Sequence, residues 1–213
     1  MYVPKLNEET DPKVLHALIR SKPLGAWACV SDGEIEVNHL PFVLKEGEGE
    51  FGMLVGHVAR ANKVWQGFSR TSHSVIIFQG EQAYISPSWY PSKHPEGKAV
   101  PTWNYAVVHV YGTPRLIEDP RKLMEHLGEL TEIHEREQSR PWKMSDAPAD
   151  FIEKLSQAIV GIEIPISRIV GKWKLGQNRP EADQHGMVSG LRSSPHSDGH
   201  ALANLIEKRF PSK

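Results

Sequence analysis

The chain has 213 residues, of which 39% are hydrophobic and 24% charged, and its formal net charge is −1 from 25 basic and 26 acidic side chains. This composition is ordinary for a globular protein with one core, and no stretch approaches the roughly 20 apolar residues that a membrane-spanning helix needs. A near-neutral chain lacks the positive field that usually carries nucleic-acid binding, so any contact with DNA has to be local. The polar, acidic N-terminus does not resemble a signal peptide, and we expect a cytoplasmic protein that does not enter a membrane.

The pattern of apolar residues changes between helical and strand periodicity along the chain. In chain order it predicts a helix at 11–22, strands at 24–31, 34–44 and 50–57, one or two helical turns at 60–68, strands at 74–79, 82–86 and 103–111, helices at 120–137 and 148–157, strands at 159–165 and 167–174, and a helix at 198–210. Asp11 before Pro12 is a typical helix start. A turn is predicted at Gly80-Glu81, between the fourth and fifth strands.

Strands in series with peripheral helices favour the α+β class and a small antiparallel β-barrel, and they disfavour a parallel doubly wound sheet. We expect one domain over residues 1–213, in which residues 192–213 form a C-terminal loop and helix. The single cysteine, Cys29, lies in an apolar run, so it cannot form an internal disulfide and is predicted to be a buried core residue.

Residues 84–105 concentrate aromatic side chains in a chain with only 8% aromatics. Prolines recur through this stretch, so much of it can be neither helix interior nor central strand. Rings on a stiff segment beside lysines and an amide suit a planar anionic ligand, for which a flavin mononucleotide (FMN) is the obvious candidate. The alternative is an ordered loop that packs its own aromatics over a sheet.

Four blocks of sequence together resemble the PaiB-type FMN-binding negative transcriptional regulators. They are His-Leu-Pro-Phe at 39–42, Gly-His-Val-Ala-Arg-Ala-Asn at 56–62, Ala-Tyr-Ile-Ser-Pro-Ser-Trp-Tyr at 83–90 and Val-Pro-Thr-Trp-Asn-Tyr at 100–105. The resemblance, which covers about residues 1–191, implies a split β-barrel like that of the pyridoxamine-phosphate-oxidase group and a homodimer with FMN between the subunits. One departure is Gly176, because the family usually has a serine at this position of Lys-Leu-Ser-Gln-Asn.

Three kinds of side chain are candidates for binding FMN. A guanidinium can engage two phosphate oxygens at once, so the predicted phosphate ligands are Arg60 first, then Lys93 and Lys174. Amides can donate and accept along the polar edge of the ring, and the candidates are Asn62, Asn104, Gln177 and Asn178. Rings that could stack on or wall the flavin are Trp89, Tyr90, Trp103 and Tyr105. The structural alternatives are a solvated surface cation, an amide that caps a turn, and aromatic packing.

No metal site and no catalytic residue is predicted. The eleven histidines include no His-Glu-x-x-His, and His196 and His200, four residues apart, lie in a Ser/Pro/Gly stretch that we do not expect to be helical. Haem is a minor alternative to FMN, since some split-barrel proteins bind it. The sequence has no Ser-His-Asp set, P-loop or Gly-x-Gly-x-x-Gly fingerprint, which sets aside hydrolysis, NTP use and Rossmann-type binding.

Three functions follow as hypotheses. The resemblance implies an FMN-binding negative transcriptional regulator, although no basic helix-turn-helix is predicted. The second is a flavin-dependent oxidoreductase, in which the protein orients the cofactor. The third is a protein that binds a flavin or haem without turnover.

Overall fold

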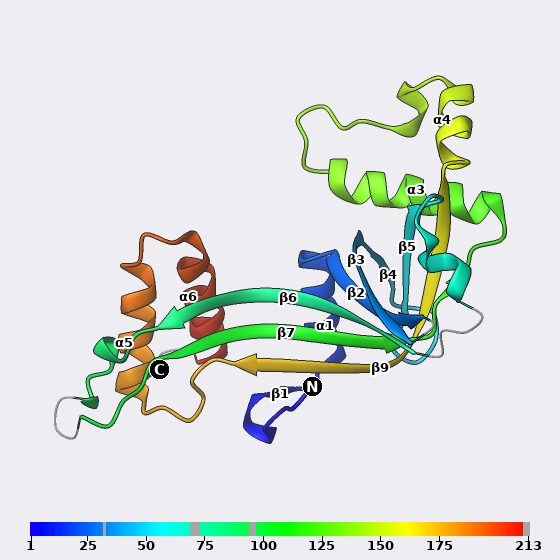
Figure 1. Ribbon diagram of the computed structural model, residues 1–213. Helices are drawn as coiled ribbons and strands as arrows, with labels where there is room; N and C mark the ends of the chain where they lie inside the picture. The colour runs from blue at the N-terminus through cyan, green and yellow to red at the C-terminus, as the bar shows by residue number, and fades with distance from the viewer. Residues whose placement is uncertain (32, 69–72, 94–96, 211–213) are drawn as a thin grey trace. The chain divides into compact units, whose positions relative to one another are not determined.

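The computed structural model describes residues 1–31, 33–68, 73–93 and 97–210 (Figure 1). Its helices are η1 (Lys5–Asn7), α1 (Pro12–Ser21), η2 (Lys63–Gly67), η3 (Pro87–Trp89), α3 (Pro120–Glu135), η4 (Met144–Asp146), α4 (Ala149–Ser156), α5 (Glu181–Arg192) and α6 (Ser197–Arg209). Its strands are β1 (Glu8–Glu9), β2 (Leu24–Ser31), β3 (Glu34–Pro41), β4 (Val43–Lys45), β5 (Met53–Ala59), β6 (Ser74–Ile85), β7 (Thr102–Gly112), β8 (Arg115–Leu116) and β9 (Ile159–Lys174). Within this described part of the chain, no helix is both long and apolar enough to cross a bilayer.

The strands form one sheet whose hydrogen-bonded order is β3-β2-β6-β7-β9-β5-β4, and β1 and β8 each pair with β9. The registers of β2 with β3, β5 with β9 and β1 with β9 are all antiparallel. A mainly antiparallel sheet with separate peripheral helices confirms the predicted α+β class.

The described residues pack as two compact units. Unit 1 comprises residues 1–14, 79–108 and 170–213, and unit 2 comprises residues 15–78 and 109–169. Strands β6, β7 and β9 contribute residues to both units. The assignment of the whole chain to one domain stays a prediction.

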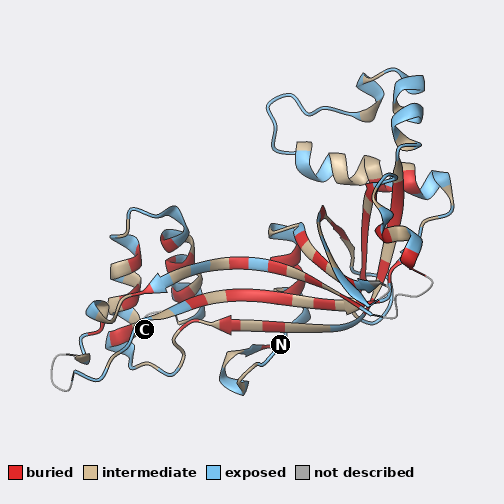
Figure 2. Ribbon diagram, viewed as in Figure 1, coloured by how far each residue is buried: buried red, intermediate tan, exposed pale blue. Residues whose placement is uncertain are grey.

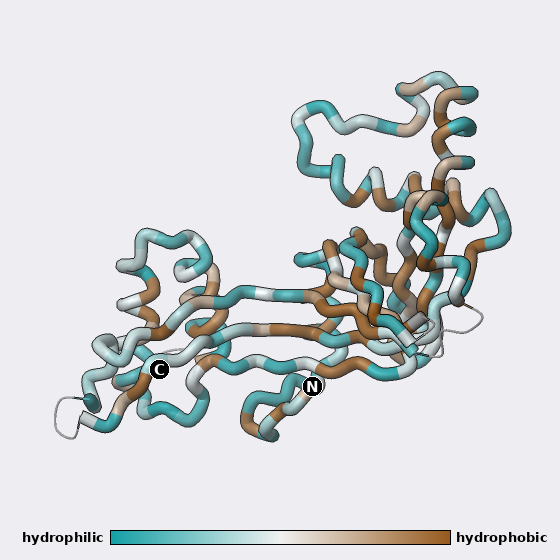
Figure 3. The backbone as a smooth tube through the Cα atoms, viewed as in Figure 1, coloured by the Kyte–Doolittle hydropathy of each residue, from teal (hydrophilic) through white to brown (hydrophobic). Residues whose placement is uncertain are grey.

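Unit 2 has an aromatic and aliphatic core beneath the β2–β3 hairpin and along β5 and β9. Trp27 of β2 is buried and packs edge-on against Phe68, with ring centroids 5.7 Å apart. Strand β5 pairs with β9 over seven positions, from Met53 with Pro165 to Ala59 with Ile159. Buried positions follow β5 and the adjoining part of β9 in Figure 2. Helix α4 alternates apolar and polar residues, which is visible as brown and teal bands in Figure 3.

Unit 1 is closed by the two C-terminal helices. Helices α5 and α6 pack against each other through buried apolar side chains, among them Met187, Leu191, Leu202 and Ile206. The N-terminal segment joins the same unit, where Glu8 and Glu9 of β1 pair with Lys172 and Gly171 of β9.

Two predicted breaks in strands are wrong. The expected turn at Gly80-Glu81 does not form, because Gly80 is buried within the continuous strand β6 and is not among the glycines with positive φ. Strand β9 likewise continues through Pro165, which lies at the last pair with β5, where a missing N–H is tolerated.

The helix predictions hold for α1, α3, α4 and α6, to within a few residues at each end. Helix α5 was not predicted. His200 lies inside α6, so the expectation that this stretch is not helical is wrong for His200, whereas His196 is the extended N-cap residue outside the helix. In both helices glycines weaken the intrinsic helical signal, and packing between the helices compensates.

Candidate functional site

Unit 1 contains a cavity of about 390 Å³, which we call the unit 1 cavity. Its walls come from the N-terminal segment, from the aromatic blocks around η3 and β7, and from the loop that follows β9. The lining residues are Pro4, Leu6, Asn7, Tyr90, Val100, Pro101, Thr102, Asn104, Lys174, Gly176, Asn178 and Arg179. The volume lies within the range of about 300 to 1,000 Å³ that is typical of small-molecule sites.

Strand β7 directs alternate side chains to opposite faces of the sheet, because successive residues of a strand point in opposite directions. Thr102 and Asn104 line the unit 1 cavity, and Asn104 is buried. Trp103 lies between them in the sequence, is 54% exposed, and packs edge-on against Tyr84 of β6 with ring centroids 6.5 Å apart. Trp103 and Tyr105 therefore face away from the cavity that Asn104 lines, and the three predicted residues do not share one site.

The loop after β9 is shaped by its own side chains. Lys174 donates from Nζ to Thr102 Oγ1 at 2.5 Å, which fixes the ammonium beside the cavity. Gln177 accepts from the N–H of Leu175 at 2.8 Å and donates from Nε2 to the carbonyl of Trp173. The Gln177 amide is thus bonded within the loop, and this residue does not line the cavity.

Gly176 is required by the conformation of this loop. Its φ is +83°, in the left-handed region that favours glycine, and a Cβ built on it would lie 2.5 Å from Met187 Cε. Met187 is buried and accepts from Asn104 Nδ2 at 3.7 Å. A serine, which is usual at this position in the resembled family, would be strained by the positive φ and would lie too close to Met187. The glycine therefore allows α5 to approach the loop closely.

Two cations lie at the unit 1 cavity. The guanidinium of Arg179 sits 4.5 Å from the centre of the Tyr90 ring, and Tyr90 is buried. Burial raises the pKa of the Tyr90 phenol, and the nearby Arg179 opposes that rise. Arg179 and Lys174 together suit an anionic ligand. Lys93 is not among the lining residues, and its backbone N–H donates to the Tyr90 carbonyl at 3.2 Å.

Trp89 is part of the packing between η3 and α5. The ring lies against Gly190, and the Trp89 carbonyl lies against Gly186, in both cases so closely that a Cβ would collide. The same turn is tied to α5 by Asp183, which accepts from the N–H of Ser92 at 3.0 Å and from its hydroxyl at 2.6 Å. Helix α5 therefore holds in place the segment that presents Tyr90 to the unit 1 cavity.

Arg60 and Asn62, the other predicted ligands, belong to unit 2. Arg60 donates from Nε to the carbonyl of Gln157 at 2.6 Å and from Nη2 to that of Ile159 at 2.9 Å. Asn62 accepts from the N–H of Val64 at 3.0 Å and caps η2. These contacts fix local backbone structure. Capping was the alternative role considered for Asn62, whereas the alternative considered for Arg60 was a solvated surface cation, which its two bonds to carbonyls do not match.

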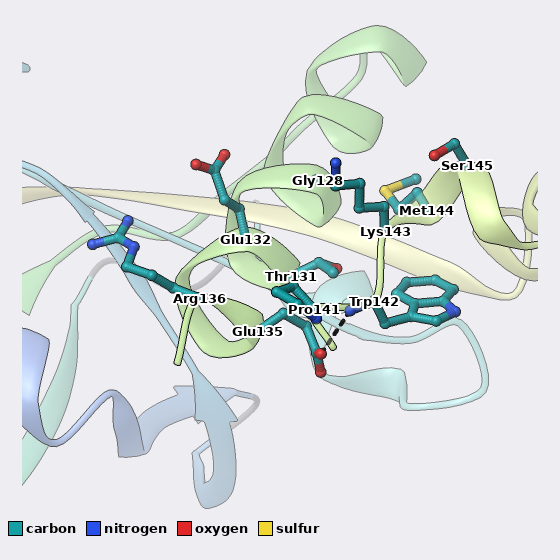
Figure 4. Close-up of a pocket in the computed structure, with 10 residues that line it drawn as sticks. All are labelled: Gly128, Thr131, Glu132, Glu135, Arg136, Pro141, Trp142, Lys143, Met144 and Ser145. Atoms are coloured by element: carbon teal, nitrogen blue, oxygen red, sulfur yellow. Dashed lines mark hydrogen bonds between the residues drawn. The ribbon is translucent and has the colours of Figure 1, made fainter. Parts of the chain in front are cut away.

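A cavity in unit 2, about 590 Å³, lies between the C-terminal half of α3 and the segment around Trp142 (Figure 4). None of the predicted ligands lines it. Glu135 reaches back to accept from the N–H of Trp142 at 2.8 Å, and Glu132 also lines it. Arg136 and Lys143 line the same cavity, so its charges balance, and we do not regard it as the cofactor site because none of the predicted ligands reaches it.

A histidine pair, buried His126 and half-buried His57, connects β5 to α3 in unit 2. His57 Nδ1 and His126 Nε2 are 3.2 Å apart, and the buried His126 Nδ1 has no hydrogen-bond partner among the residues that the structure describes. Burial lowers the pKa of both rings, that of His126 to about 4, with smaller contributions from His57 and Lys45. Over residues 1–31, 33–68, 73–93 and 97–210, no group of three or more His, Cys, Asp or Glu could hold a metal ion.

The structure therefore brings together four of the candidate residues, Tyr90, Asn104, Lys174 and Asn178. Sequence reasoning missed Arg179, although it directly follows Asn178 in the loop, and it placed Tyr90 only among several stacking candidates. The position of Arg179 directly after the predicted ligand Asn178 was a signal in the sequence that could have identified it.

Comparison with known proteins gives a family and a fold. The family model described as "Putative FMN-binding domain" matches residues 1–168. An uncharacterised protein of Emericella nidulans is 32% identical over 248 aligned positions, covering 100% of this chain and 99% of the relative. The Bacillus subtilis protein named "Protease synthase and sporulation protein PAI 2" is 29% identical over 210 positions, covering 99% of this chain and 98% of the relative.

Among solved structures, the FAD and heme binding protein of Mycobacterium smegmatis matches with a TM-score of 0.58 at 15% identity. The match covers 86% of this chain and 80% of that protein. Similarity at this level of identity concerns the fold alone. With the sheet order, it confirms the predicted split β-barrel.

Proposed function

The chain belongs to the family described as "Putative FMN-binding domain", and on that premise we propose that it binds FMN in the unit 1 cavity. The observation that carries the proposal is the convergence of Asn104, Lys174 and Asn178 on one cavity from blocks about 70 residues apart in the sequence.

The lining suits the two halves of FMN. Lys174 and Arg179 would hold the phosphate, because charge-assisted hydrogen bonds from fixed cations are the strong ones. Asn104 and Asn178 would donate to and accept from the polar edge of the ring, and Tyr90 would cover part of its face. When bound, FMN supplies a redox-active ring, while these residues bind and orient it.

The same lining favours a flavin over haem. Haem iron is held by His, Cys, Met or Tyr side chains. The described residues that line the unit 1 cavity include no His, Cys or Met, and the one candidate, Tyr90, lies under Arg179. We therefore propose FMN as the ligand.

Titration with FMN, followed by flavin absorbance and fluorescence quenching, tests this proposal. Lys174→Met and Arg179→Met should each weaken FMN binding by about tenfold or more, because each removes a charge-assisted contact. Trp103→Phe is the matched control, since Trp103 faces away from the cavity, and it should leave the affinity unchanged. Equal affinity in all four proteins, or no binding by the native chain, would overturn the assignment.

We further propose that the protein is a negative transcriptional regulator whose action responds to FMN. The four blocks that resemble PaiB-type regulators and the full-length similarity to the B. subtilis protein support this. The test is retention of sheared DNA from the source organism by the protein with and without FMN. Enrichment of particular fragments that changes with FMN supports the role, and retention no better than that of an unrelated protein refutes it.

A homodimer is the assembly that we propose. The β2–β3 hairpin of unit 2 carries an aliphatic face with the exposed side chains Leu24, Val30, Ile35 and Val37. The register places Val30 opposite Ile35 and Ala28 opposite Val37, so these side chains share one face of the sheet. Ile35 is 74% and Val37 56% exposed, and contiguous exposed apolar surface of this kind marks interaction sites.

An apolar face of this kind can be buried against the same face of a second copy by two-fold symmetry. Sedimentation velocity should give a dimer for the native chain and a monomer for Ile35→Lys with Val37→Lys. Leu155→Lys, on an exposed position of α4, is the control that should remain dimeric. A native monomer would refute the proposal.

A further inference from the structure

The first turn of α5 holds both partners of the stack that Arg179 and Tyr90 form at the unit 1 cavity. Asp183 is buried and accepts from the N–H and the hydroxyl of Ser92, two residues after Tyr90. Gln184, the next residue of α5, donates from Nε2 to the carbonyl of Arg179 at 3.0 Å. Consecutive residues of one helix therefore fix the two segments that bring the ring and the guanidinium together.

The backbone of Arg179 is hydrogen-bonded on both sides. Its N–H donates to the carbonyl of Gly176 at 2.9 Å, and its carbonyl accepts from Gln184. The next carbonyl, that of Pro180, accepts from the N–H groups of Asp183 at 2.9 Å and Gln184 at 3.1 Å. Because these bonds restrict the backbone dihedrals, the side chain of Arg179 starts from a fixed point beside the cavity.

The guanidinium of Arg179 is restricted as well. Its Cζ lies 4.5 Å from the centre of the Tyr90 ring, and Tyr90 is only 2% exposed. A cation over the face of an aromatic ring is attracted by the quadrupole of that ring. An arginine that is ordered before its ligand arrives loses less freedom on binding, and this preorganisation raises the affinity.

We infer that Gln184 is a positioning residue for the phosphate of the bound flavin. By holding the backbone of Arg179 it fixes the guanidinium beside the anion, and it thereby contributes to a preference for FMN over riboflavin, which lacks the phosphate. Gln184 is not among the residues that line the unit 1 cavity, so it acts through Arg179. This inference rests on the proposed function, in which Lys174 and Arg179 hold the phosphate.

The test compares the affinities for FMN and riboflavin, measured by fluorescence quenching of each flavin. The native chain should prefer FMN by about tenfold or more. Gln184→Met keeps the length and helix propensity of the side chain but cannot donate, so FMN affinity should fall by about three- to tenfold while riboflavin affinity changes by less than about twofold. Gln82→Met is the matched control, since Gln82 is an exposed residue of β6 in the same unit, and both affinities should stay at the native values.

Two further measurements separate positioning from general support of the fold. In a chain that already carries Arg179→Met, adding Gln184→Met should weaken FMN binding by less than about twofold, because no guanidinium remains to be positioned. Phosphorus NMR of bound FMN gives the second pKa of the phosphate, which is about 6 for a free monoester and is lowered by a fixed cation. That pKa should lie below 6 in the native protein and move back toward 6 in Gln184→Met, while circular dichroism shows an intact fold.

Equal weakening of FMN and riboflavin binding by Gln184→Met would overturn the inference, because the glutamine would then support only the shape of the cavity. Full additivity with Arg179→Met, or an unchanged phosphate pKa, would overturn it as well. A native chain that binds FMN and riboflavin equally makes no productive phosphate contact, so the inference would fall while flavin binding would stand. If the native chain binds neither flavin, the proposed function itself fails.

Discussion

Replacing Gly190 with alanine tests the contact between α5 and η3 that positions Tyr90. A Cβ at Gly190 would lie 2.6 Å from Trp89 Cε2 and closer still to the neighbouring ring atoms, which a rigid indole cannot avoid by rotating one bond. Forcing an extra carbon into a packed contact costs about 1 to 3 kcal/mol. Alanine also stabilises a helix by up to about 1 kcal/mol relative to glycine. Because the Cβ would lie only 2.2 Å from Trp89 Cδ2, the steric cost should be at the upper end of its range, about 3 kcal/mol, and the net loss near 2 kcal/mol.

Gly128→Ala is the matched control within α3. Gly128 is likewise half-buried in a helix, but the nearest atom to its built Cβ is Met144 Sδ at 3.8 Å, an ordinary contact. This variant should therefore gain up to about 1 kcal/mol from helix propensity alone. The two glycine-to-alanine changes should have opposite signs.

Urea denaturation monitored by circular dichroism measures both changes in the free energy of unfolding. Gly190→Ala should lower the melting temperature by about 4 to 8 °C, since 1 kcal/mol corresponds to roughly 2 to 4 °C in a chain of this size. Trp89→Leu should relieve the clash, so the double variant should lose less than the sum of the single losses. A Gly190→Ala protein as stable as Gly128→Ala would refute the reasoning.

Three further outcomes follow from the structure. Gly176→Ala should lose about 1 to 2 kcal/mol of unfolding free energy, because its φ is +83° and its Cβ would press on Met187; thermal melts check this. Asp183→Ala should lose about 1 to 3 kcal/mol in the same assay, because it removes the buried carboxylate that accepts from both the N–H and the hydroxyl of Ser92. The free energy of unfolding should also fall by about 3 kcal/mol from pH 6.5 to 4, because His126 binds a proton near pH 6.5 in the unfolded state but only near pH 4 in the folded state. Urea unfolding at a series of pH values should show a smaller dependence on pH for His126→Leu than for the native chain.

Local signals account for what the sequence predicted correctly. Asp119 before Pro120 marks the start of α3, and Asp119 does cap it by accepting from the Arg121 N–H at 2.9 Å. The strand predicted at 103–111 is β7 with one residue added at each end. These elements are specified by caps and periodicity, which depend only on residues near in sequence.

Helix α5 shows what local signals omit. Gly186 and Gly190 lower its intrinsic helix propensity, so a sequence pattern argues against a helix there. The structure needs those glycines because Trp89, about 100 residues earlier, lies in the space that side chains would fill. Gly186 and Gly190, which make the helix hard to predict, are therefore the residues that its packing against Trp89 requires.

In the candidate site, too, some features could be predicted from local sequence and others depend on contacts between distant residues. The period of two within β7 was sufficient to separate Trp103 and Tyr105 from Asn104, once a strand had been predicted at 103–111. No local pattern, however, could show that the guanidinium of Arg60 bonds to carbonyls of Gln157 and Ile159, almost 100 residues away. A side chain's chemistry states what it can bind, while the fold decides which partner reaches it first. Arg60, the strongest phosphate candidate by residue type, already has two partners, and Arg179, which was not predicted, lines the cavity.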